Sequence, residues 1–145
     1  MRIKLVENIN WFKDRCTQLV ENYDNLEEVY FTPRNREIHY NRHVISDEDG
    51  PLKMDYMTID EYDELADKLS SAEAGKINDR LSQIIGYQTK GGRFVKHDTL
   101  SKLTVVYVDD DINGHEAISL YKQPTNKFFR KLNDENSVMA FGNHI

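Results

Sequence analysis

The chain has a single cysteine, Cys16, so it contains no internal disulfide and no cysteine-rich zinc site. It has no run of 18 apolar residues, and we therefore expect no membrane-spanning segment. The first seven residues contain charged side chains and no uninterrupted apolar stretch, so no secretory signal is expected. These absences together predict a reducing, cytoplasmic location for the protein.

The composition is polar, with a mean hydropathy of -0.71, but it is that of a folded chain. Aromatic residues make up 10% of the sequence, which argues against disorder because disordered segments lack large apolar groups. A length of 145 residues is enough for one hydrophobic core. Without repeats or linkers, we predict a single domain over 1–145, with a helical extension (1–30), a core (31–133) and a tail (134–145).

Charge is distributed unevenly along the chain. The net charge of -6 by itself disfavours a nucleic-acid partner. Residues 44–85, however, carry eleven acidic and only four basic side chains, whereas residues 86–132 carry eight basic and five acidic ones. The later part of the chain is therefore compatible with a polyanion, and the middle part is not.

Apolar spacing predicts helices in the first half of the sequence. Apolar residues recur every three or four positions over 5–23 and again over 58–70, where Thr58 and Glu61 are spaced as a capping box. Another helical piece is expected just before Gly86. It would carry the apolar residues Ile77, Leu81, Ile84 and Ile85.

Residues 28–32, before Pro33, have the composition of a strand. After Gly86, apolar residues alternate with polar ones, as they do in strands. Strands are expected at 93–98, 103–108 and 115–122, and a last helix begins at Thr125. The predicted fold class is α+β, in which N-terminal helices precede a twisted antiparallel meander of about four strands and a short C-terminal helix.

Five short motifs follow one another in a recognisable order between His39 and Pro124. They read His39-Tyr40-Asn41-Arg42-His43, Glu61-Tyr62-Asp63-Glu64-Leu65-Ala66, Gly92-Arg93-Phe94-Val95-Lys96-His97-Asp98, Leu103-Thr104-Val105-Val106-Tyr107 and Ala117-Ile118-Ser119-Leu120-Tyr121-Lys122-Gln123-Pro124. This order resembles the barnase–EndoU–colicin–RelE group of RNases, as found in the C-terminal domains of polymorphic bacterial and phage toxins. Arg42 replaces the usual Lys, Ser119 replaces the usual Thr, and Gln123 is inserted before Pro124.

The resemblance implies a metal-independent RNase toxin with His43, Lys96 and Ser119 at its catalytic centre. Histidine suits proton transfer because its pKa lies near neutrality. His39 lies four residues from His43 and so shares its face in a helix or a strand. Lys96 would neutralise charge that develops on the scissile phosphate.

Further candidates follow from strand alternation and charge. Ser119 and Tyr121 lie two residues apart on one strand, so both are expected on one face as catalytic hydroxyls. Arg42, Arg93 and Lys122 are candidate substrate-binding residues, although alternation sends Arg93 to the face opposite Lys96. His97, beside Lys96, is expected to be a surface histidine.

We expect no cofactor and no metal, because His39 and His43 have no third ligand at metal-binding spacing. The expected partners are RNA, with transfer RNA as a candidate, and a cognate immunity protein or antitoxin, with no DNA or membrane. The site of action would be the cytoplasm of a target or host bacterium.

Two alternatives remain open at the level of sequence. The chain is small and acidic, so a non-catalytic inhibitor, such as an immunity protein or a phage anti-defence protein, would cover a basic partner with residues 47–67. The second alternative is a protein that keeps the toxin fold, has lost its activity and binds RNA or protein.

Overall fold

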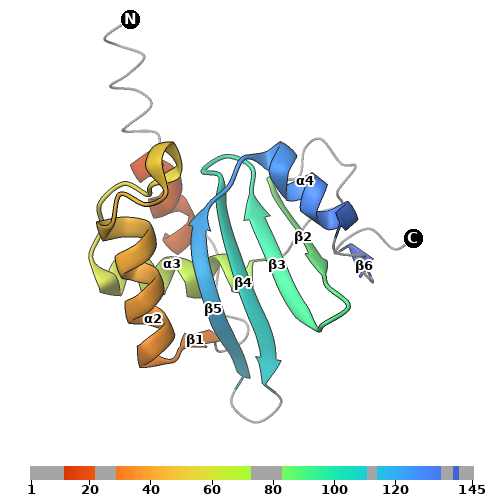
Figure 1. Ribbon diagram of the computed structural model, residues 1–145. Coiled ribbons are helices and arrows are strands. Elements are labelled where there is room, and N and C mark those ends of the chain that lie inside the picture. The colour runs from red at the N-terminus through yellow and green to blue at the C-terminus, as the bar shows by residue number, and fades with distance from the viewer. Residues whose placement is uncertain (1–11, 22–28, 73–82, 111–113, 135–138, 141–145) are drawn as a thin grey trace, which may run out of the picture.

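A six-stranded sheet forms the centre of the computed structural model, which describes residues 12–21, 29–72, 83–110, 114–134 and 139–140 (Figure 1). The strand order is β1-β5-β4-β3-β2-β6. The strands are β1 (Val29–Phe31), β2 (Ile84–Gln88), β3 (Arg93–Asp98), β4 (Leu103–Asp110), β5 (Gly114–Lys122) and β6 (Met139–Ala140).

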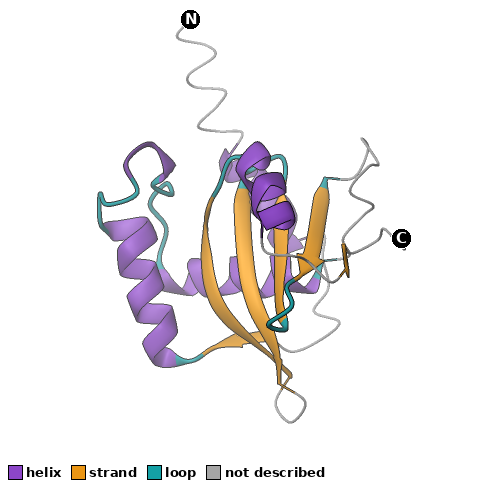
Figure 2. Ribbon diagram, turned by 45° about the vertical axis from the view of Figure 1, so that its right-hand side comes forward, coloured by secondary structure: helices purple, strands orange, loops and turns teal. Residues whose placement is uncertain are grey.

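Helices cover both faces of the sheet (Figure 2). They are residues 12–21, α2 (Pro33–Tyr40), the π-helical turn η1 (Asn41–Ile45), the 3-10 turn η2 (Gly50–Leu52), α3 (Ile59–Ser71) and α4 (Thr125–Asp134). Within the described residues, none of these helices combines the length and apolar character needed to cross a membrane.

The predicted α+β class is confirmed. Strands β2 to β5 form an antiparallel meander that follows the helices, and β1 and β6 extend it at the edges. Strand β1 pairs with β5 in parallel, which sequence periodicity had not predicted. Helix α3 begins as expected, with Thr58 and Glu61 forming the reciprocal capping box.

The helical prediction before Gly86 is wrong for Ile84 and Ile85, which belong to β2, whereas 77 and 81 lie outside the described residues. Successive strand residues point to opposite faces, and both faces of β2 are covered. Ile84 therefore packs with the α3 core and Ile85 with the α4 core. Because both faces of β2 are buried, Ile84 and Ile85 are both apolar, and the sequence lacks the alternation of apolar and polar residues by which a half-exposed strand is predicted.

Two hydrophobic cores flank the sheet. On one face, α3 packs against β4 and β5, and the Tyr62 hydroxyl donates to the Leu120 carbonyl. On the other face, Phe128 of α4 packs against Ile85, Tyr87 and Val95. We call these the α3 face and the α4 face of the sheet.

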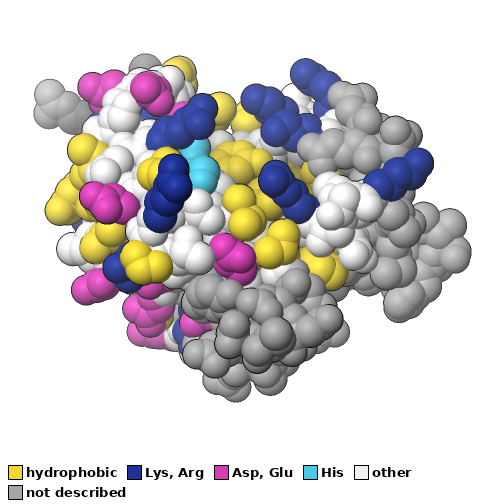
Figure 3. Space-filling model, turned by 60° about the horizontal axis from the view of Figure 1, so that its bottom comes forward, with side chains coloured by type: hydrophobic (Ala, Val, Ile, Leu, Met, Phe, Trp, Pro, Cys, Tyr) yellow, Lys and Arg dark blue, Asp and Glu magenta, His cyan; other side chains and the backbone are white. Residues whose placement is uncertain are grey.

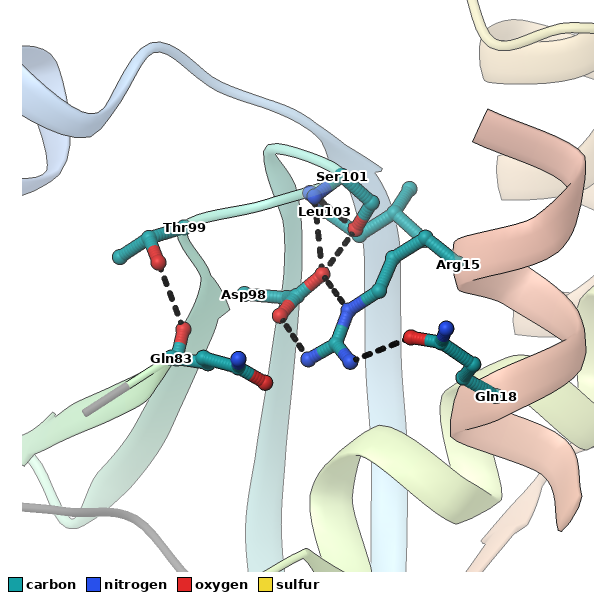
Figure 4. A network of polar contacts seen from close by, with 7 residues as sticks. All are labelled: Arg15, Gln18, Gln83, Asp98, Thr99, Ser101 and Leu103. Carbon is teal, nitrogen blue, oxygen red and sulfur yellow. Dashed lines mark hydrogen bonds and ion pairs between the residues drawn. The ribbon is translucent and has the colours of Figure 1, made fainter. Parts of the chain in front are cut away.

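The N-terminal helix is tied to the sheet on the α3 face by a buried ion pair (Figure 4). Arg15 Nε lies 2.9 Å from Asp98 Oδ2, and its second terminal nitrogen binds Oδ1. Asp98 also accepts from the backbone and hydroxyl of Ser101. Because Phe12 and Leu19 join the same core, residues 12–21 of the predicted helix 5–23 are an integral layer of the fold; the rest of that prediction lies outside the described residues.

Asp98→Ala is expected to lower the free energy of unfolding by about 3–5 kcal/mol, because it removes the carboxylate that neutralises the buried Arg15 guanidinium. The double variant Arg15→Met, Asp98→Leu should recover most of that loss. Urea denaturation of the three proteins measures the effect. Lys53→Met, which breaks an exposed ion pair with Asp47, is the control and should change little. Equal losses in the control and in Asp98→Ala would contradict a structural role for the buried pair.

Candidate active site

A π-helical turn brings His43 to the sheet. Helix α2 begins at Pro33 behind the N-cap Thr32, and at Tyr40 it passes directly into η1. The amide of Ser46 closes this wider turn on the Asn41 carbonyl at 2.7 Å. Isolated π-helical turns are rare and are frequent at functional sites. The turn buries His43, while its neighbour Arg42 stays exposed.

His43 bridges a carboxylate and a hydroxyl. Its Nδ1 lies 2.6 Å from Asp49 Oδ2, and its Nε2 lies 3.4 Å from Ser119 Oγ. A carboxylate on Nδ1 holds the proton there and leaves Nε2 as the basic nitrogen. Asp49 was missed in the sequence because it belongs to an acidic stretch that reads as a solvated loop. Gly50, with a φ of +55°, turns the chain directly after it.

Two further rings pack around His43. His39 is stacked on it at 5.7 Å between ring centroids, and Tyr121 lies at 5.6 Å in a tilted arrangement. Burial, followed by the charges of His43 and Arg42, holds the pKa of His39 below its ordinary value. His39 is therefore a neutral imidazole at pH 7, and its Nδ1 is buried without a hydrogen-bond partner in the described chain.

Ser119 and Tyr121 both lie on the α4 face, as their spacing predicts. Ser119 pairs with Val106 of β4, which in turn pairs with Val95 of β3, and directly opposed residues share a face. Next to Ser119, the register shifts so that Tyr107 pairs with Ala117. A β-bulge of this kind re-aims neighbouring side chains and is common beside active sites.

Lys96 does not join this group, so the expected grouping of Lys96 with His43 and Ser119 is wrong. Lys96 lies on the α3 face, where its ammonium donates to the carbonyls of Ser70 and Ala72 at the end of α3. Such a cation satisfies carbonyls that the helix leaves unpaired. Alternation instead places Arg93, the lesser candidate, on the α4 face with Val95, where it is exposed.

A cavity of about 130 Å³ opens beside His43. Helix α4 contributes two lysines at helical i,i+4 spacing, which the sequence analysis did not single out. The cavity is lined by His43, Asp49, Leu52, Tyr121, Lys122, Gln123, Lys127 and Lys131. In Figure 3, Lys and Arg side chains lie on both sides of a small patch of histidine surface.

Of the other predicted substrate-binding residues, Lys122 is part of the cavity lining and Arg42 is not. The Lys122 ammonium, however, lies 4.4 Å from the ring centroid of Phe12 on the α3 face. Arg42 is exposed and lies 3.8 Å from Glu48. Lys127 and Lys131 are therefore better placed than Lys122 to bind an anion in the cavity.

His97 is fully buried, which corrects its interpretation as a surface histidine. Alternation does turn it away from Lys96, but that side of the sheet is covered by α4. Phe128 stacks on the ring at 5.0 Å, and Thr104 and Thr125 bind its two nitrogens. Burial, with a smaller effect of the Lys102 charge, lowers the pKa of His97 to about 4.

A larger cavity of about 450 Å³ lies between helix 12–21 and α3. Its wall contains apolar side chains and carboxylates such as Glu61 and Glu64, but no histidine. Among the described residues, no three His, Cys, Asp or Glu side chains are arranged to hold a metal ion. The smaller cavity is therefore the candidate active site, because it brings the His43–Asp49 pair together with the lysines of α4.

Compared with known proteins, the chain matches no family model, no curated protein and no solved structure. The function must therefore be inferred from the residues and their geometry.

The buried His97 predicts a pH dependence of stability. Because its pKa is about 4 in the folded protein and near 6.5 when unfolded, the unfolded chain binds the proton first as the pH falls. The stabilising contribution is present above pH 6.5 and is lost towards pH 4, by about 3 kcal/mol. Urea titrations at several pH values should show a shallower loss in His97→Gln than in the wild type. Parallel curves for the two proteins would contradict the assignment.

Proposed function

We propose that the protein is a metal-independent ribonuclease that cleaves RNA by transesterification to a 2′,3′-cyclic phosphate. The observation that carries the proposal is the Asp49–His43–Ser119 chain, which lies beside a cavity lined by two lysines of α4. The resemblance of the motif order to RNase toxins supports the same reaction. We expect action in the cytoplasm of a target or host bacterium, with transfer RNA as a candidate substrate and an immunity protein or antitoxin as the neutralising partner.

Each group has a role in this reaction. His43 Nε2 takes the proton of the ribose 2′-hydroxyl, whose oxygen then attacks the phosphorus, and Asp49 stabilises the imidazolium that forms. Lys127 and Lys131 neutralise the charge that develops on the phosphate oxygens. The bond from phosphorus to the 5′-oxygen breaks, and the Tyr121 hydroxyl supplies the proton that this oxygen takes up. The proton held by the His43 imidazolium then returns to Tyr121 through water, which restores both groups. His39 packs on His43 and fixes its ring.

Ser119 holds the Nε2 side of His43 before substrate binds. A serine, histidine and aspartate in this order are also the components of a serine hydrolase. Ser119, however, lies within β5, and the cavity beside His43 is lined by Lys127 and Lys131 of α4. Because the phosphate of a phosphodiester is an anion, these lysines favour a phosphodiester substrate that reacts at His43.

The acidic surface favours a second candidate, the non-catalytic inhibitor of a basic partner. Asp60, Glu61 and Glu64 are exposed on α3, and Asp55 lies beside them at the larger cavity. An inhibitor would use this surface and would not depend on His43. The effect of His43 substitution therefore separates the two functions.

Wild-type protein is expected to cleave purified transfer RNA or total RNA equally well with and without EDTA. His43→Ala should reduce the rate at least about 100-fold, because it removes the base. Asp49→Asn should reduce it as well, by failing to stabilise the imidazolium. Gel analysis and detection of the cyclic phosphate end measure the reaction, and Lys90→Ala in the exposed β2–β3 turn is the control. Intact RNA at micromolar wild-type protein would rule out the proposal.

Substitution of both α4 lysines tests the anion site. Lys127→Ala with Lys131→Ala should lower kcat/KM and reduce the salt dependence of RNA binding, because fewer phosphate contacts release fewer counterions. Loss of one good charge-stabilising donor costs about 3–4 kcal/mol in the transition state. Fluorescence anisotropy over a salt series measures the binding. If Lys90→Ala changed the salt dependence as much as the double variant, α4 would have no specific role.

A further inference from the structure

A buried amide nitrogen beside the candidate site has no hydrogen-bond partner among the described residues. Gln123 follows β5, is 2% exposed and lines the same cavity as His43. Its Nε2 has no hydrogen-bond partner in the part of the chain that the structure describes. Buried donors are nearly always paired because an unpaired one is costly, so this group requires an explanation. Gln123 is also the residue inserted before Pro124 relative to the toxin motif.

A chain of hydrogen bonds orients the Gln123 amide. The Lys102 ammonium, which only donates, lies 3.0 Å from Thr125 Oγ1. The Thr125 hydroxyl is thus free to donate to His97 Nε2 at 2.9 Å. With Nε2 accepting from Thr125, a neutral His97 carries its one proton on Nδ1 and donates it to Thr104 Oγ1 at 2.7 Å.

The last link of the chain reaches Gln123. Thr104 Oγ1 accepts from His97, so the Thr104 hydroxyl hydrogen is donated to Gln123 Oε1 at 3.3 Å. The oxygen of the amide is therefore occupied, and both hydrogens of Nε2 remain for a ligand. Lys127 and Lys131 add only donors to the cavity, and Asp49 Oδ2 is bound to His43. Gln123, Lys127 and Lys131 therefore present donors from one side of the cavity, which suits a ligand group that presents acceptors there.

We propose that Gln123 recognises a nucleobase carbonyl, either O6 of guanine or O4 of uracil, next to the scissile phosphate. Adenine and cytosine carry an amino group at the corresponding position, which would place a donor against a donor. The cavity of about 130 Å³ is well below the size of drug-binding pockets and suits a single small group such as a base. Tyr121 lines the cavity and offers a ring for stacking. This inference rests on the proposed ribonuclease function, and it adds the specificity of the same site.

Binding of the four 3′-nucleotides to the whole chain tests the inference. In calorimetric titrations, 3′-GMP and 3′-UMP are expected to bind the wild type about ten-fold more tightly than 3′-AMP and 3′-CMP. Gln123→Met keeps the length of the side chain and removes the amide, so all four nucleotides should bind it alike. Gln88→Met on the α3 face is the matched control and should retain the preference.

A second variant keeps the test decisive if Gln123→Met does not fold. Thr104→Val removes the hydroxyl that orients the amide and should weaken the preference in the same direction. Equal binding of the four nucleotides to the wild type, a preference for 3′-AMP and 3′-CMP, or an undiminished preference in Gln123→Met would each overturn base recognition. Inorganic phosphate binding as tightly as 3′-GMP would also overturn it, because the cavity would then be an anion site.

The same set of proteins separates this inference from the proposed function. RNA cleavage without any difference between bases would leave the ribonuclease standing and refute the role of Gln123. A preference for 3′-GMP and 3′-UMP in a protein that leaves RNA intact would support base recognition and refute the ribonuclease.

Discussion

Alternation of side chains across a sheet that is covered on both faces is the constraint on which the rest of the structure depends. Each residue of the central strands must serve either the α3 face or the α4 face. Strand β3 shows the consequence. Its Lys96 and Asp98 point to the α3 face, where they hold the end of α3 and the N-terminal helix. Val95 and His97 point to the α4 face and support α4.

The candidate site lies on the α4 face, and it is assembled from segments that are far apart in sequence. The π-helical turn after α2 supplies His43, the residue before η2 supplies Asp49, and β5 supplies Ser119. Helix α4 adds the lysines that give the cavity its charge. The net acidity of the chain does not conflict with the proposed RNA substrate, since Lys127 and Lys131 line the candidate cavity whereas Asp60, Glu61 and Glu64 are exposed on α3.

Stability and function use opposite sides of the same strands. On the α3 face, the buried Arg15–Asp98 pair and the core around Tyr62 hold the helices to the sheet. On the α4 face, hydrogen bonds run from Lys102 through His97 to Gln123 and end at the cavity. Because His97 belongs to both the α4 core and this chain, the packing of α4 and the orientation of the Gln123 amide depend on each other.

The sequence by itself determined the fold class, the capping box of α3, the position of three strands and the shared face of Ser119 and Tyr121. These features are local, because periodicity and neighbouring residues carry them. Tertiary structure alone decided that Lys96 lies away from His43, that His97 is buried and that Asp49 holds the imidazole. Each of these depends on which strand lies opposite which and on which helix covers each face. Such contacts join residues six to 76 positions apart around His43, and no local pattern encodes them.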